Sequence, residues 1–281
     1  MLIPNERPAW LQERSVAADR TQSYIAVQTV DKTYATRNGD VRAVEHADFD
    51  VQQGDFLSLV GPSGCGKSTL MSMIGGLETP SSGSIRVGGR PIEGPRRDFG
   101  YVFQDATLLP WKTVMDNVLF PIRTQKRPVA DYLGEAERLL RLTGLWDFRD
   151  KRPSELSGGM RQRVAICRGL INDPQLLMMD EPFSALDAIT RDEMNLMLAR
   201  LWDEVHKTAV FITHSIREAV YLSDRVLVMN ARPSRIVADI RVPFARPRRP
   251  EMQEDPVFNT ICGFVRDTIH AGHESRGAQG G

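Results

Sequence analysis

Short apolar runs alternate with helical patterns along most of the chain. Each run has the length of a β-strand and is followed by polar or glycine-rich residues, as expected where a buried strand ends. The segments between the runs carry apolar residues three and four positions apart. Strands that alternate with helices are typical of an α/β fold built on a parallel sheet. We predict its strands at 56–60, 99–103, 176–179 and 209–213.

A second set of strand patterns lies before and beside these runs. Residues 24–30 are the first of them, and Asn38-Gly39 is a strong signal for a tight hairpin turn leading into 41–51. Further hairpins are predicted around 84–89 and across 224–240. The early hairpins predict an antiparallel sheet that flanks the parallel one.

The middle of the chain changes to a helical pattern punctuated by prolines, from Trp111 to about Arg152. Its clearest amphipathic helix is expected at 131–142. We therefore predict an inserted helical subdomain at about 105–165, within one folded domain that spans 21–245.

The two ends of the chain are expected to lie outside this domain. Residues 1–20 are polar and are predicted to form a mobile leader. The tail, 246–281, is too short for a second domain and is expected to hold a short helix around 258–270, with a disordered end from 271. The basic run Arg246–Arg249 lies among prolines. We expect a solvated loop there, with a lipid-surface patch as the alternative.

Composition limits the partners and the compartment. The 281 residues include 36 Lys and Arg and 36 Asp and Glu, so the formal net charge is zero and no overall field attracts nucleic acid or anionic lipid. Three widely spaced cysteines, Cys65, Cys167 and Cys262, favour a reducing compartment. The N-terminus lacks the apolar core of a signal peptide, and no stretch reaches the length of a membrane span. We expect a cytosolic protein.

The glycine-rich stretch after the strand at 56–60 carries the most specific chemistry in the sequence. It fits the phosphate-binding pattern G-x-x-x-x-G-K-[ST]. Its glycines let backbone N–H groups turn inward, and the helix that follows directs its positive end at the same point. Lys67 adds a full charge at the β- and γ-phosphates of a nucleotide, and the Ser68 hydroxyl can ligate Mg²⁺. We predict nucleotide contacts from the whole stretch: Gly61, Pro62, Ser63, Gly64, Cys65, Gly66, Lys67, Ser68 and Thr69.

Two acidic residues close the strand at 176–179 and supply the groups that hydrolysis needs. Asp180 lies where the strand meets a loop, and we assign it to Mg²⁺ through a water molecule. Successive residues at a strand end point in different directions, so Glu181 can face the attacking water as the general base. The alternative is that this acidic pair only caps a helix.

Two further polar residues follow strands of the same sheet. Ligands of open α/β sheets bind beyond the carboxyl ends of the strands. Gln104 is therefore expected to touch both the metal and the attacking water, and His214 to hydrogen-bond the γ-phosphate. Each of them, taken alone, also fits an ordinary polar surface residue.

The stretch Leu-Ser-Gly-Gly-Met-Arg-Gln-Arg at 156–163 opens a helix whose free N–H groups suit an anion. It resembles the signature motif of ATP-binding cassette (ABC) ATPases, and the whole resemblance covers about 24–240. The motifs follow one another in the family's order: the loop 61–69, Gln104, the signature at 156–163, Asp180-Glu181, the segment 184–187 and His214. The resemblance implies an α/β fold with a P-loop NTPase core of the ABC type, an antiparallel β subdomain and an inserted helical subdomain. It also implies ATP hydrolysis with ATP and Mg²⁺.

Members of this family pair head to tail and hold two ATP molecules between them. The resemblance implies that Ser157, Gly158 and Gly159 of one copy bind the γ-phosphate held by the other, in a two-fold arrangement. Asp187 is implied to link the two sites. Tyr34 is implied to stack on adenine, with a half-buried strand aromatic as the alternative.

The finer resemblance is to ATPase subunits of importers for nitrate, sulfonates, taurine and related small solutes. It is carried by 94–104, Leu108–Trp111, 116–118 and Asp180–Asp187. It implies a membrane permease that inserts a short helix near Leu108–Trp111, and an external solute-binding protein that acts through the permease. For Leu109 and Trp111 the alternative is packing inside the helical subdomain.

The implied location is peripheral, at the cytoplasmic face of the cell membrane, with no nucleic acid as partner. Two other functions stay open at this point. One is a soluble ABC ATPase that acts on nucleic acid or ribosomes, which the single cassette and the lack of net basic charge disfavour. The other is the ATPase subunit of an exporter.

Overall fold

The computed structural model describes residues 23–37, 39–230 and 234–277, with side chains up to Ala271. The leader predicted at 1–20 lies outside these ranges, as do Asn38 of the hairpin turn and residues 278–281 of the tail.

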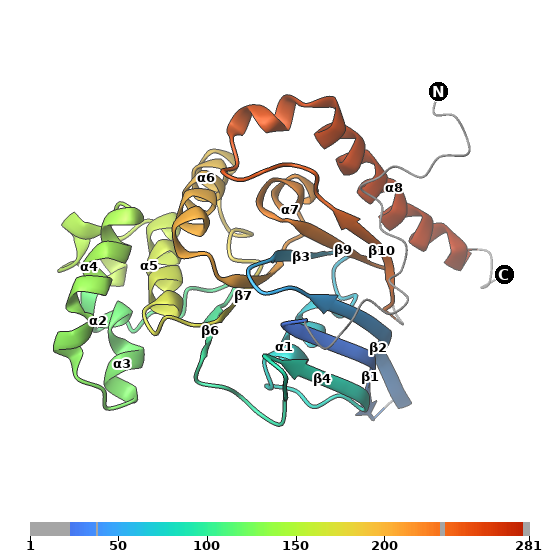
Figure 1. The fold of residues 1–281 in the computed structure, drawn as a ribbon, viewed down its shortest axis with the longest axis horizontal. Coiled ribbons are helices and arrows are strands. Elements are labelled where there is room, and N and C mark those ends of the chain that lie inside the picture. Colours follow the sequence, from blue (N-terminus) through green and yellow to red (C-terminus); the bar gives the residue numbers. More distant parts are fainter. Residues whose placement is uncertain (1–22, 38, 231–233, 278–281) are drawn as a thin grey trace.

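Within the described residues, six strands form the central sheet in the order β10-β9-β3-β8-β7-β6 (Figure 1). All neighbours are parallel except β10, which runs antiparallel to β9. The strands are β3 (Phe56–Val60), β6 (Phe99–Val102), β7 (Leu176–Asp180), β8 (Thr208–Ile212), β9 (Arg225–Met229) and β10 (Ile236–Arg241). The four strands predicted from apolar runs are all members of this sheet.

Both faces of the sheet are covered, which explains why its strands are apolar throughout rather than alternating. Phe56 and Val60 of β3 pack into the core that also holds α5, α6, α7 and α8, whereas Leu57 and Leu59 pack with α1 and the second sheet. The helices are α1 (Lys67–Ile74), α5 (Gly158–Leu170), α6 (Ala188–Val205), α7 (Ile216–Leu222) and α8 (Pro256–Gly277).

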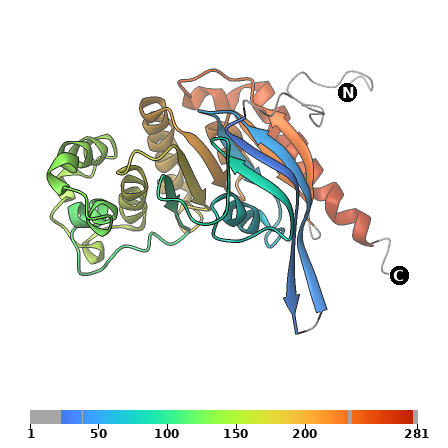
Figure 2. The same ribbon diagram turned by 60° about the horizontal axis from the view of Figure 1, so that its bottom comes forward.

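The early strands form a separate antiparallel sheet in the order β2-β1-β4-β5, as predicted. Its longest pair is a hairpin whose ladder runs from Ile25 opposite Val51 to Thr36 opposite Gly39, and Figure 2 shows this hairpin extending away from the body. The strands are β1 (Ile25–Thr36), β2 (Gly39–Val51), β4 (Ser82–Val87) and β5 (Arg90–Pro91).

The inserted helical region lies at the opposite end of the molecule from α8 (Figure 1). It contains α2 (Val114–Val118), α3 (Phe120–Thr124) and α4 (Leu133–Leu142), joined to α5 by short 3₁₀ turns. The helix expected at 131–142 begins at Leu133, because a 3₁₀ turn at Val129–Tyr132 follows Pro128. The helical character of this region is thus as predicted, with a later start for its main helix.

The tail is more ordered than the sequence suggested. Helix α8 confirms the helix expected at 258–270 and continues to Gly277, so the expectation of disorder is wrong for 271–277. Phe258, Ile261 and Val265 lie at helical spacing and are fully buried in the main core. This apolar stripe joins α8 to α7 and fixes the tail to the rest of the fold.

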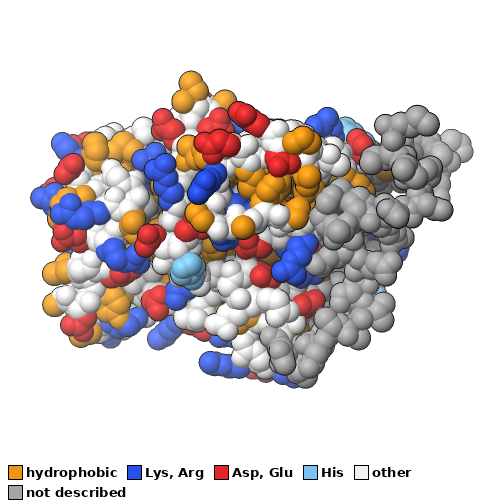
Figure 3. All heavy atoms as spheres, turned by 45° about the horizontal axis from the view of Figure 1, so that its top comes forward, with side chains coloured by type: hydrophobic (Ala, Val, Ile, Leu, Met, Phe, Trp, Pro, Cys, Tyr) orange, Lys and Arg blue, Asp and Glu red, His pale blue; other side chains and the backbone are white. Residues whose placement is uncertain are grey.

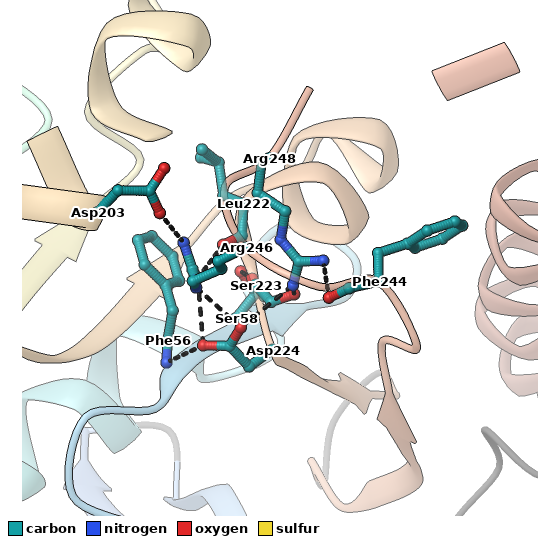
Figure 4. A network of polar contacts seen from close by, with 9 residues as sticks. All are labelled: Phe56, Ser58, Asp203, Leu222, Ser223, Asp224, Phe244, Arg246 and Arg248. Atoms are coloured by element: carbon teal, nitrogen blue, oxygen red, sulfur yellow. Dashed lines mark hydrogen bonds and ion pairs between the residues drawn. The ribbon is translucent and has the colours of Figure 1, made fainter. Parts of the chain in front are cut away.

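The prediction of a solvated basic loop at Arg246–Arg249 is wrong for two of its arginines (Figure 4). Arg246 donates from Nε to Oδ1 of Asp224 over 3.0 Å, and Arg248 donates from Nη2 to the same oxygen over 3.1 Å. Arg248 is only 5% exposed, and burial lowers the pKa of its guanidinium to about 10. Arg249 remains exposed.

These contacts form a compact group that we call the Asp224 cluster, made of Asp224, Arg246 and Arg248. Asp224 also accepts the backbone N–H of Phe56 over 2.9 Å, at the start of β3. The two arginines further donate to the carbonyl oxygens of Leu222 and Ser223. A basic run has the same sequence pattern whether it is solvated or buried. Here its arginines are buried because they bond to Asp224, which lies some twenty residues earlier in the chain.

Candidate functional site

The phosphate-binding loop follows β3 directly, and close backbone contacts dictate its glycines. Gly61 has φ +157° and Gly66, at the start of α1, has φ +103°. A Cβ atom on Gly61 would lie 2.4 Å from the carbonyl oxygen of Met229, and one on Gly66 would lie 2.7 Å from that of Ala43. Any other residue at these positions would displace the backbone of β9 or β2, so only glycine lets the loop close.

Lys67 and Ser68 open helix α1 and point in different directions. The Lys67 side chain is nearly buried, and its Nζ donates to the carbonyl oxygens of Gly61 and Pro62, both over 3.0 Å. The Ser68 hydroxyl donates to Oδ1 of Asp180 over 3.1 Å. The loop serine and the strand-end aspartate expected to serve one metal are therefore in direct contact.

The donor atoms at this point suit Mg²⁺. A hydroxyl and a carboxylate oxygen are hard ligands, and Mg²⁺ is usually bound by one or two protein oxygens together with phosphate oxygens and water. Burial raises the pKa of Asp180, with the neighbouring charge of Glu181 adding to the effect and the Ser68 hydrogen bond opposing it. A divalent cation would offset this cost of ionising Asp180.

Glu181 is held in a strained backbone conformation beside Asp180. Its φ of +44° is in the left-handed region, which is uncommon for a residue other than glycine. Its N–H donates to the carbonyl oxygen of Ile212 over 2.9 Å, and its own carbonyl oxygen accepts the Ser184 hydroxyl over 2.9 Å. Its Oε2 lies 3.1 Å from Nδ1 of His214. The sharp turn brings the strand ends of β7 and β8 together at one carboxylate–imidazole pair.

Lys67, Ser68, Asp180 and Glu181 line a cleft of about 570 Å³ between the phosphate loop and the β1–β2 hairpin. It brings together most of the site residues expected from the sequence. They are Tyr34, Ser63, Gly64, Gly66, Lys67, Ser68, Thr69, Gln104, Asp180 and Glu181.

Three residues of the hairpin also line the cleft and were not identified from the sequence: Thr36, Val41 and Ala43. Val41 lies directly opposite Tyr34 in the β1–β2 ladder. The hairpin signal and the period of two along a strand were the available clues, since they place every second residue near Tyr34 on one face. The half-buried Tyr34 side chain lines this cleft. Its ring also makes a cation–π contact with Lys32, whose Nζ is 4.8 Å from the ring centre.

The loop after Gln104 is fastened to helix α5. Gln162 donates to the Phe103 carbonyl oxygen over 2.9 Å, and Arg168 donates to the carbonyl oxygens of Ala106 and Thr107. Further along, the side chain of Asn117 is fully buried and bonds the backbone of Leu109 through both its oxygen and its nitrogen.

The exposure of the two candidates in that segment, Leu109 and Trp111, tests the alternative of packing inside the helical subdomain. Trp111 is 67% exposed, so it does not pack inside the helical subdomain. Leu109 is half-buried. The large apolar ring of Trp111 is therefore available at the surface.

The signature residues and Asp187 do not line the cleft. Ser157 caps α5 by accepting the Met160 N–H over 3.2 Å, and both Ser157 and Gly158 are exposed. Gly159 lies against α6, where an added Cβ would be 2.8 Å from the Thr190 side chain. The structure thus places the starts of α5 and α6 side by side on the surface, away from the phosphate loop of the same chain.

Three residues of the phosphate-binding stretch and one strand-end residue also lie outside the cleft lining: Gly61, Pro62, Cys65 and His214. Cys65 is 1% exposed, and burial raises the pKa of its thiol, so it is a neutral packing residue beneath the loop. Exposed His214 reaches the cleft through its contact with Glu181.

A P-loop fold with an acidic pair beside its phosphate loop defines a nucleotide-hydrolysing domain of the P-loop class. Residues 44–184 match the family model described as ABC transporter. The chain is 41% identical to a nitrate import ATP-binding protein of Synechococcus elongatus, covering 91% of this chain and 95% of the relative. It is 42% identical to a taurine import ATP-binding protein of Jannaschia sp., with 79% and 83% covered.

Solved structures agree with this assignment. A dimeric, post-hydrolysis state of an ATP-binding cassette bound to ADP and Pi superposes with a TM-score of 0.68 at 29% identity, covering 79% of this chain and all of that one. The chain belongs to the ABC transporter family and is an ATPase of the ATP-binding cassette type. The expected fold class and the ABC ATPase function are confirmed, and a nucleic-acid ATPase is not favoured.

Proposed function

We propose that this chain hydrolyses MgATP in the cleft between two head-to-tail copies and thereby drives the import of a small anionic solute through a membrane permease. One observation carries the enzymatic part. The cleft places the Ser68–Asp180 contact and the Glu181–His214 contact side by side, beyond the carboxyl ends of neighbouring strands.

The roles of the residues follow from their positions. Lys67 exchanges its two backbone carbonyl partners for the β- and γ-phosphate oxygens, and the N–H groups of residues 63–68 surround the phosphates. Tyr34 stacks on the adenine from the hairpin side of the cleft. Mg²⁺, held by Ser68 and Asp180 with Gln104 nearby, would neutralise charge on the phosphate oxygens.

Glu181 accepts a proton from the attacking water, and His214 orients the Glu181 carboxylate and hydrogen-bonds the γ-phosphate. The water attacks in line with the bond to the leaving oxygen, so positioning supplies most of the rate enhancement. The strained backbone of Glu181 keeps its side chain directed into the cleft instead of along the strand.

The second copy supplies the remaining contacts to the γ-phosphate. Helix α5 begins at the surface, where Ser157 and Gly158 are exposed and Gly159 follows as a buried residue. The unbonded N–H groups of a helix start suit an anion bound to another molecule. Asp187 caps α6 immediately beside them. Closure on ATP and opening after hydrolysis would give the permease its two states.

The transport role is supported by the relatives named above, which are import ATP-binding proteins for nitrate and for taurine. None of the helices in the described ranges is long and apolar enough to cross a bilayer. For the permease in this proposal, the exposed Trp111 offers an apolar contact. We place the chain at the cytoplasmic face of the membrane, with an external binding protein delivering the solute. On the face shown in Figure 3, basic and acidic side chains are interspersed. A protein surface that binds nucleic acid carries a continuous basic patch instead.

The test is purification of the tagged chain from detergent-solubilised membranes of its native cell, followed by solute uptake measurements. A polytopic permease at one-to-one stoichiometry, together with loss of nitrate or sulfonate uptake in a Glu181→Gln strain, is the expected result. Recovery of ribosomal or nucleic-acid material without a membrane protein would overturn the transport role and leave the ATPase assignment intact.

A further inference from the structure

A buried carboxylate on α7 lies between two segments of the site, 213–215 and 181–187. Glu218 is 5% exposed and does not line the cleft. Each of its two carboxylate oxygens contacts a different segment of the site. One contact leads to His214, and the other leads to the segment that ends at Asp187.

The first contact reaches the turn that holds His214. Oε2 of Glu218 accepts the Thr213 hydroxyl over 2.6 Å, and the oxygen of that hydroxyl accepts the Ser215 N–H over 3.0 Å. The Ser215 hydroxyl in turn accepts the Glu218 N–H over 3.3 Å. Both neighbours of His214 in the chain are therefore fastened to Glu218, so the position of the imidazole depends on this carboxylate.

The second contact reaches the segment between β7 and α6. Oε1 of Glu218 lies 3.6 Å from Nε of Arg191, and Nη2 of Arg191 donates to the carbonyl oxygen of Leu186 over 2.8 Å. Leu186 immediately precedes Asp187, the N-cap of α6. Arg191 thus carries the influence of Glu218 to the last residues of the 181–187 segment.

The two contacts close a ring. The 181–187 segment begins at Glu181, whose carboxylate is 3.1 Å from His214, and it ends at Asp187. Both ends are connected through separate contacts to the single carboxylate of Glu218. A displacement of His214 must therefore move the 181–187 segment or break one of these bonds.

Packing alone does not account for a charged residue at this position. Burial raises the pKa of Glu218, and the Thr213 hydrogen bond and the charge of Arg191 oppose that shift. An apolar side chain would fill the same space without the cost of desolvating a charge. The Arg191 Nε is also buried without a hydrogen bond, so the Glu218 carboxylate 3.6 Å away is the group that offsets its charge.

We propose that Glu218 is a positioning residue that couples His214 to the 181–187 segment. The position of His214 at the γ-phosphate of one site is then passed through Arg191 to Asp187, which faces the second copy. This inference rests on the proposed dimeric ATP site. Through Glu218, contact of His214 with the γ-phosphate would affect the position of Asp187 at the subunit interface.

The experiment compares Glu218→Gln and Arg191→Gln in the full-length chain by steady-state ATP hydrolysis. The amide keeps the size of the side chain and an acceptor for Thr213 but loses the charge that attracts Arg191. We expect kcat to fall by about tenfold in each variant while the KM for ATP changes by less than about twofold, because the phosphate loop is untouched. Matched controls are Glu204→Gln and Arg200→Gln, exposed residues of α6, which should keep the parental kcat.

The double variant separates positioning from general destabilisation. If the two residues act as one link, Glu218→Gln combined with Arg191→Gln is no slower than either single variant. Losses that multiply, or a parental kcat in the single variants, would overturn the proposal. If Glu218→Gln fails to fold, the kcat of Arg191→Gln, a change at a half-buried residue, tests the proposal by itself. A parent chain without ATPase activity, or an active Glu181→Gln variant, would instead overturn the proposed function.

Discussion

Charged side chains lie at both ends of the central sheet. Those at one end face an open cleft, and those at the other end are paired with one another. Beyond the carboxyl ends of the strands, Lys67, Asp180 and Glu181 line an open cleft. At the amino ends of β3 and β9, the Asp224 cluster is turned inward, and its charges bond to one another and to backbone carbonyls. The first group keeps binding capacity for a ligand, whereas the second uses its capacity to hold the tail.

Residues at the carboxyl ends of the strands thus serve catalysis, and those at the amino ends serve stability. A change at the carboxyl end should alter ATP chemistry with little effect on folding. A change at the amino end should alter folding with little effect on the chemistry of the molecules that remain folded.

Glu181→Gln should lower kcat for ATP by about a thousandfold, because the amide cannot accept the proton of the attacking water. ATP binding should persist, since Lys67 and the phosphate loop are unchanged. Steady-state hydrolysis and equilibrium binding of a fluorescent ATP analogue measure the two effects. Unchanged turnover would rule out Glu181 as the base.

Lys67→Ala should weaken ATP affinity by about ten- to a hundredfold, the range expected when a charged hydrogen-bond donor is lost. The melting temperature without nucleotide should change little, because the hydrogen bonds of the Lys67 side chain, to two carbonyl oxygens and to the Cys65 sulfur, all stay within its own loop. Isothermal titration with ATP is the measurement, and the exposed Lys126→Ala is the control. Equal affinities in the two variants would mean that the loop does not hold the phosphates.

Asp224→Asn should destabilise the fold by about 2 kcal/mol, because two largely buried arginines lose their counter-charge while solvent screens part of the loss. Thermal melting should fall by about 4–8 °C for a domain of this size. The exposed Asp267→Asn on α8 is the control. A drop in kcat for the folded fraction, without a change in melting, would contradict the structural role of the cluster.

Cys65 should show the smallest effect, although it lies inside the phosphate loop. Burial raises the pKa of its thiol, so little of the reactive thiolate is present at neutral pH. The thiolate fraction rises only at a pH above the pKa of a free cysteine, about 8.5. Iodoacetamide labelling at pH 7.5, followed by peptide mass spectrometry, should find Cys65 unmodified in the folded protein and modified in urea. Rapid labelling of the native chain would show that the loop opens.

The fold and the centre of the site follow from local sequence patterns. Strand runs, the loop 61–69 and the acids at 180–181 are each defined by neighbours within a few residues, so their geometry is local and could be predicted. The same holds for Gln104 and His214, because a residue that ends a parallel strand must lie at one known edge of the sheet.

The remaining features depend on partners far apart in the chain. Arg248 is buried because Asp224 lies beside it, Val41 lines the cleft because the hairpin folds over the loop, and Glu218 becomes a link because Arg191 and Thr213 meet it. Apart from the hairpin pattern around Val41, their local sequence gives no signal, since burial and charge pairing are set by contacts across the fold. Local sequence patterns therefore specify which chemistry the chain carries, whereas contacts between distant segments set which charges face the ligand and which hold the protein together.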